Sequence, residues 1–202
     1  MIGLALALAA TGMQPAEPKG MSSWLTDADY PSREAQKYGQ GSTRVTLTIG
    51  PDGRTRRCEV PITSGSAVLD KRACQVLMER ARFAPATDQD GKAVFSSFST
   101  SVNWKTPGSG KDFRANQTDL ILVVKSLPRA VEMPSRVRVM ALVGADGKLE
   151  RCEPHPSDAN AAVLGPAACQ QVAAMLKLQP IADGEIPVRS VQVLTIGFNA
   201  QK

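Results

Sequence analysis

The chain has 202 residues, of which 43% are hydrophobic and 21% charged. These values exclude a disordered chain and fit one ordinary domain or two small ones. The formal net charge is +5, but the basic residues are scattered. Their densest run, Arg54 to Arg57, has no aromatic residue beside it, so we expect a solvated basic face rather than nucleic-acid binding.

The chain begins with an uncharged apolar run from Ile2 to Ala10 (IGLALALAA). This run is too short to cross a bilayer and has the length of the central region of a secretory signal peptide. We therefore predict that residues 1–20 are a signal peptide and leader, and that the chain is exported. No basic residue precedes the run, so a start site further upstream is the alternative. The other alternative, a buried core helix, would have polar residues on one face, and this run has none. We predict no membrane-spanning segment.

An internal repeat organises the rest of the chain. VTLTIGPDGRTRRCEV begins at Val45 and VMALVGADGKLERCEP begins at Val139. Both contain an apolar alternating run, an Asp-Gly turn and an Arg-Cys-Glu sequence, at an offset of 94 residues. Later landmarks agree within one residue, including Cys74 with Cys169 and Trp104 with Phe198. Self-similarity on one offset indicates two copies of one structural unit.

In the first copy, alternation from Val45 to Ile49 predicts a strand, Asp52-Gly53 a hairpin turn, and the chain up to Ile62 a returning strand. Helical spacing follows the Ser64-Gly65-Ser66 break, with Pro85 ending the helix. The spaced residues are Leu69, Ala73, Val76 and Leu77. A last strand is predicted from Val94 to Trp104, with Phe98, Thr100, Val102 and Trp104 on one face and Ser97, Ser99, Ser101 and Asn103 on the other.

The second copy predicts the same order of elements. A strand covers Val139 to Val143, and a helix opens at Pro166, directing Val172, Met175 and Leu176 inward. The last strand, Val188 to Phe198, has apolar residues on both faces, so we expect it to be covered on both sides, with the first copy as a candidate cover. Leu120 to Val124 is expected to add a strand to this half.

Four cysteines allow three pairings. The repeat favours Cys58 with Cys74 and Cys152 with Cys169, each linking the second strand to the helix over it. A metal site is not expected, because the ligand spacing of zinc sites is absent and the only histidine, His155, lies between prolines. A redox-active thiol is the remaining alternative, although no C-x-x-C occurs.

Nothing in the sequence indicates catalysis. No nucleophile lies beside a base in a known pattern, no glycine-rich phosphate loop follows a strand, and carboxylate pairs are lacking. We therefore predict a protein that is not an enzyme and holds no cofactor.

The first copy resembles the TonB C-terminal domain family. The resemblance rests on Tyr30-Pro31, the Pro-Asp-Gly turn within VTLTIGPDGRTRRCEV, the segment LDKRACQVLMERARFAPA and the closing strand to Trp104. The second copy is divergent, with Leu127-Pro128 for Tyr-Pro and Leu178 for Phe83. The predicted organisation is an α+β chain of two tandem β-β-α-β modules, each a three-stranded antiparallel sheet with a packed helix. The first module is residues 26–106, a linker spans 107–118, and the second module is residues 119–202.

The resemblance implies a periplasmic protein-binding module. In the family, the last strand offers an edge to the TonB-box peptide of an outer-membrane TonB-dependent transporter, which pairs by strand addition. The alternative is that this strand pairs with the second copy. The residues implied as partner-binding are Tyr30, Pro31, Val94, Phe95, Ser96, Ser97, Phe98, Ser99, Thr100, Ser101, Val102 and Trp104.

Energy-transducing members carry a membrane anchor and a long proline-rich spacer, which this sequence does not show. Two further hypotheses therefore stay open. One is a complete energy transducer with a wrongly assigned start, and the other is a periplasmic thiol-redox protein.

Overall fold

The computed structural model describes residues 12–32, 40–105, 118–128, 131–132 and 135–201. The apolar run Ile2–Ala10 lies outside these ranges. In the first half, the elements are β1 (Glu17–Lys19), the 3-10 turns η1 (Met21–Ser23) and η2 (Asp27–Asp29), β2 (Gln40–Ile49), β3 (Thr55–Ile62), α2 (Ala67–Arg80), β4 (Arg82–Ala84), β5 (Ala86–Thr87) and β6 (Ala93–Lys105). In the second half they are β7 (Leu120–Val124), β8 (Ser135–Val143), β9 (Leu149–Pro154), α3 (Ala161–Met175), β10 (Ile181–Asp183), β11 (Ile186–Val188) and β12 (Ser190–Ala200).

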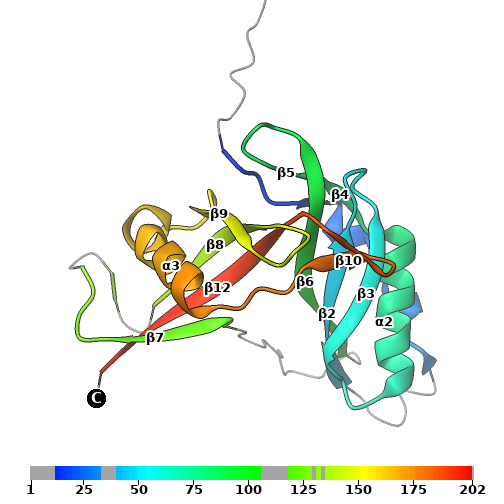
Figure 1. Cartoon of the computed structure of the whole chain (residues 1–202). Helices are drawn as coiled ribbons and strands as arrows, with labels where there is room; N and C mark the ends of the chain where they lie inside the picture. Colours follow the sequence, from blue (N-terminus) through cyan, green and yellow to red (C-terminus); the bar gives the residue numbers. More distant parts are fainter. Residues whose placement is uncertain (1–11, 33–39, 106–117, 129–130, 133–134, 202) are drawn as a thin grey trace, which may run out of the picture.

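The two halves share one eight-stranded sheet. Its main path is β3-β2-β6-β12-β8-β9, with β5 added to β6 and β7 added to β12. Two separate antiparallel sheets were predicted. Instead, β6 and β12 join them through a short parallel contact, Phe95 with Ser190 and Ser96 with Val191. Helices α2 and α3 lie at opposite ends of the molecule (Figure 1), and each packs on strands of its own half, α2 on β3 and β2 and α3 on β9 and β8.

The two halves have the same strand registers. Gly41 pairs with Trp104 in the first half, and Ser135 pairs with Phe198 in the second. Both members of the second pair lie 94 residues after those of the first, as the repeat predicted. The β2–β3 and β8–β9 ladders also correspond, down to an irregularity near the turn in each. At both turns the glycine has positive φ, 74° at Gly53 and 79° at Gly147, as the hairpin prediction required.

Helix α2 carries the predicted inward face. Leu69, Ala73, Val76 and Leu77 are all fully buried. The side chain of Ser66 caps the N-terminus by accepting the N–H of Leu69. The predicted end at Pro85 is wrong, because the helix stops at Arg80 and the next residues turn into β4. Pairing of β4 with β1, Phe83 opposite Pro18, replaces the continuing helical hydrogen bonds.

Helix α3 differs from its prediction in two ways. It begins at Ala161, so Pro166 lies inside it rather than at its first position. Burial of Leu164, which is 3% exposed, favours the extra turn despite the N–H that Pro166 lacks. Met175 is 58% exposed at the C-terminal end and does not face inward, whereas Val172 is fully buried as predicted.

A separate cluster of buried side chains packs the halves against each other. Val191 of β12 lies there with Val94 and Ala86 of the first half, and Val193 packs beside it. This confirms that the first half covers the second face of the last strand. The strand itself begins at Ser190, because Val188 belongs to the β10–β11 hairpin. The cluster also contains Met140 and Leu142, together with Met13, which is 1% exposed.

An ion pair reinforces this contact between the halves. Arg189 donates to Asp88 and to Glu150, both at 2.7 Å. The hydrogen bond from Arg189 lowers the pKa of Asp88, which is 2% exposed. The N-terminal residues add further links, because Gln14 bridges to Thr87 and the N–H of Met13 donates to Glu153. Residues 12–20, predicted as leader, are thus part of the fold.

Both predicted disulfides are present. Cys58 bonds Cys74 and Cys152 bonds Cys169, with Cα–Cα distances of 5.6 and 5.5 Å. Each links the edge strand of its half to the helix above it.

Candidate functional site

Strand β6 has one occupied edge and one largely open edge. From Ser96 to Lys105 it pairs with β2, from Ile49–Ser96 to Gln40–Lys105. On the other edge, β12 pairs with Phe95 and Ser96, and β5 pairs with Ala93 and Val94 beyond the end of the β2 ladder. From Ser97 to Lys105, no strand within the described residues pairs with this second edge.

The predicted partner-binding residues therefore fall into two groups. Val94, Phe95 and Ser96 are paired inside the molecule, with Val94 and Ser96 also buried. Ser97 to Trp104 lie on the open stretch, with the predicted alternation: Val102 and Trp104 are buried, while Ser99 and Asn103 are exposed. The ring of Tyr30 packs at a tilt against that of Trp104, with 5.4 Å between ring centroids, and Tyr30 and its neighbour Pro31 are both half-buried.

The corresponding registers of β6 and β12 show which main-chain N–H groups of β6 point toward its open edge. The N–H of Thr195 in β12 donates to the carboxylate of Asp119 at 2.7 Å and so points away from β8. Ser101 occupies the same register position in β6. Because main-chain groups alternate along a strand, the N–H groups of Ser101 and Asn103 face away from β2. No described strand pairs with them.

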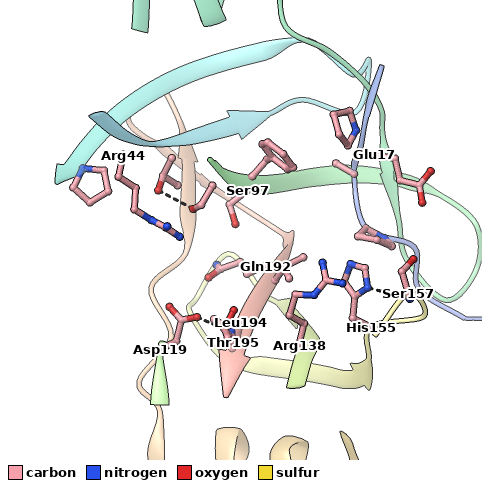
Figure 2. Close-up of a pocket in the computed structure, with 18 residues that line it drawn as sticks. Glu17, Arg44, Ser97, Asp119, Arg138, His155, Ser157, Gln192, Leu194 and Thr195 are labelled. Atoms are coloured by element: carbon pink, nitrogen blue, oxygen red, sulfur yellow. Dashed lines mark hydrogen bonds between the residues drawn. The ribbon is translucent and has the colours of Figure 1, made fainter. Parts of the chain in front are cut away.

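Beyond their short contact, β6 and β12 diverge and enclose a cleft of about 640 Å³. Figure 2 shows Ser97 and Arg44 on one wall and Gln192, Leu194 and Thr195 on the other. The N-terminal segment around Glu17 lines a third side. Phe98, whose ring contacts those of Trp24 and Phe83, also lines the cleft and is only half-buried.

The cleft carries both charges. Arg44 and Arg138 lie on opposite walls, and Glu17 and Asp119 are its acidic residues. Burial, together with the charge of Arg138, lowers the pKa of His155, so its imidazole is neutral at pH 7 and accepts the N–H of Ser157. The two arginines and the two acidic residues balance in charge, and serine and threonine hydroxyls also line the cleft. Such a lining suits an extended main chain better than a strongly charged ligand.

Sequence reasoning missed Arg44 and Arg138 as site residues. They lie 94 residues apart and occupy corresponding register positions in the two halves, a signal that the sequence offset contained. It also missed Asp29, which holds the segment before β2 against α2. Arg72 and Arg80 donate to its carboxylate at 2.6 and 2.8 Å. Burial alone would raise the pKa of Asp29, but the hydrogen bonds, above all those from Arg80 and Thr26, outweigh it and lower the pKa to about 2.

The comparisons with known proteins concern this first half. Residues 26–106 match the family model of the Gram-negative bacterial TonB protein C-terminal. The match supports the resemblance seen in the sequence and ends one residue after β6. Domains of this family are periplasmic, non-enzymatic and interact with outer-membrane TonB-dependent transporters. No curated protein matches the chain.

The described residues add two observations about other kinds of function. Neither α2 nor α3 has the length and apolarity to cross a membrane, and no other described helix does. Within the same ranges, no three His, Cys, Asp or Glu side chains gather in a way that suits a metal ion. All four cysteines are in disulfides.

Proposed function

We propose that this protein is an exported, periplasmic binding module of TonB type that takes an extended peptide segment of an outer-membrane TonB-dependent transporter by strand addition to β6. The family match supports the class of module. The observation that carries the proposal is that no described strand pairs with the β6 edge from Ser97 to Trp104, opposite the edge that pairs with β2.

Side chains along this edge favour the same function. Strand addition uses main-chain hydrogen bonds for affinity and alternate side-chain contacts for selectivity. The half-buried rings of Phe98 and Tyr30 offer apolar surface to alternate side chains of a ligand. The serines on the opposite face keep an edge strand polar, which protects it from unwanted pairing.

The second half takes a supporting role in this proposal. We infer that residues 119–202 are a divergent second module, because strand registers and the disulfide position repeat. Its β12 occupies the start of the β6 edge and confines the binding stretch to Ser97–Trp104. Val94, Phe95 and Ser96 then position the strand instead of contacting the ligand.

Titration of the oxidised protein with N-terminal plug segments of the host's TonB-dependent transporters tests the proposal. Amide NMR shifts are expected to concentrate on Ser97 to Trp104. Ser101→Pro removes an outward N–H without disturbing the β2 ladder, so binding should weaken by about tenfold or more. Ser101→Ala, the matched control, should bind as the wild type does. Equal binding by both variants, or shifts elsewhere, would contradict strand addition at β6.

A further inference from the structure

The counterpart of the open β6 edge is closed in the second half. Strand β7 pairs in parallel with β12, from Leu120–Ile196 to Val124–Ala200. Asp119 extends the contact: its N–H donates to the carbonyl of Thr195 at 2.8 Å, and its carboxylate accepts the Thr195 N–H at 2.7 Å. The residues from Asp119 to Val124 therefore all lie along the β12 edge.

Only alternate side chains of the segment are used. Leu120, Leu122 and Val124 pack against the buried cluster of the second half. Ile121 and Val123 point away and are 57% and 66% exposed. This is the arrangement of a peptide ligand bound by strand addition, in which one side-chain face enters the site and the other remains in water.

The attachment of β7 is also one-sided. Among the described strands, β7 pairs with β12 alone, and its second edge has no strand partner. It belongs to neither of the ladders that repeat between the halves. An edge strand held by one neighbour is the element of a sheet most readily exchanged.

We propose that β12 is a second strand-accepting site, which the chain's own segment Asp119–Val124 closes from within. The site takes an extended peptide that runs parallel to β12, with an acidic residue followed by aliphatic side chains at alternate positions. This proposal goes beyond binding at β6, because it concerns a different edge and does not require the transporter as a partner. The intramolecular segment competes with external peptides at an effective concentration of about millimolar.

A synthetic peptide with the sequence of residues 118–125 (TDLILVVK) is the probe. It is titrated into the whole oxidised protein carrying Leu120→Ser and Leu122→Ser, which weaken the packed face of β7. The matched control protein carries Ile121→Ser and Val123→Ser on the exposed face. Urea unfolding of both variants establishes that they remain folded.

The packed-face variant is expected to bind the peptide, with amide shifts on Thr195 to Phe198. The control variant and the wild type should bind at least about 100-fold more weakly, because β7 still occupies the edge. A peptide with serine at its first and second leucines should not bind.

Two results would overturn the proposal. In the first, the packed-face variant shows exposed β12 amides but takes no peptide, so that β7 is an ordinary structural strand. In the second, the peptide shifts only β6, so that β12 does not accept strands. Neither result depends on whether transporter segments bind β6, so the two proposals fail separately.

Discussion

The two halves share strand registers and a disulfide position, but the segment before the first long strand lies in a different place in each half. In the first half, Asp29 fixes this segment on α2 through Arg72 and Arg80. In the second half, α3 has no charged residue, and the corresponding segment is β7, added to β12. The segment of the first half therefore contacts the helix, and the segment of the second half pairs with the edge of the sheet.

From this difference we infer that a few residues outside the sheet decide whether the edge of the last strand is open or paired. A carboxylate and two guanidinium groups fix one segment on α2. An aliphatic run without charge, Leu120 to Val124, lacks such partners and instead completes the apolar cluster beside β12. The sheet ladders alone would not distinguish an open edge from a closed one.

The largest expected effect lies in the cores. Phe83 is 3% exposed and contacts the rings of Trp24 and Phe98, whereas its counterpart Leu178 is half-buried among aliphatic residues. Phe83→Ala should lower the free energy of unfolding by about 3–5 kcal/mol, and Leu178→Ala by about 1–2 kcal/mol. Urea unfolding followed by circular dichroism measures both. Equal losses would contradict the view that the first half depends more on one aromatic position.

Removing either disulfide should come next in size. The pairs close loops of similar length, with sequence separations of 16 and 17. Replacing both cysteines of one pair by alanine should therefore cost about 3 kcal/mol in either half. Thermal unfolding of the two double variants would show whether the halves are alike here. A much larger loss in the second half would mean that its aliphatic core relies on the cross-link more heavily.

The Asp29 contact should produce the smallest of these effects, in acid. Its pKa is about 2 in the folded protein, against an ordinary value of 3.8. The contribution, about 2 kcal/mol, is fully present above pH 4 and is lost as the pH falls toward 2. Asp29→Asn should remove this part of the pH dependence of stability. Asp27→Asn, on the exposed side of the same turn, should retain it, and a loss in both would contradict the assignment.

Local features of the fold were predictable from the sequence. Alternation from Val45 to Ile49, helical spacing from Leu69 to Leu77, and the repeated cysteines correctly gave strands, a helix and both disulfides. The offset of 94 residues also anticipated equal registers. These features depend on neighbours in the chain or on comparison of the copies, both of which the sequence contains.

Features set by distant contacts were not predictable in the same way. The parallel contact between β6 and β12 involves only two residue pairs and leaves no periodic signal. Met13 looked like part of a leader, yet it fills the cluster between the halves. Pro166 suggested a helix start, but burial of Leu164, two residues earlier, favours a helix that begins at Ala161. For the candidate site, the sequence predicted this strand with two alternatives, an open edge or pairing with the second half. The structure shows that pairing at Phe95 and Ser96 alone among the described residues, and the choice of partner-binding residues stays a prediction.

Amide hydrogen exchange on the free, oxidised protein tests whether the β6 edge is open while the β12 edge is closed. It compares Ser101 and Asn103 of β6 with their counterparts Thr195 and Gly197 of β12. An open β6 edge and a closed β12 edge predict that the first two amides exchange faster by a factor on the order of 100. Protection of Ser101 and Asn103 equal to that of Thr195 and Gly197 would mean that β6 already has a partner, which would contradict the account.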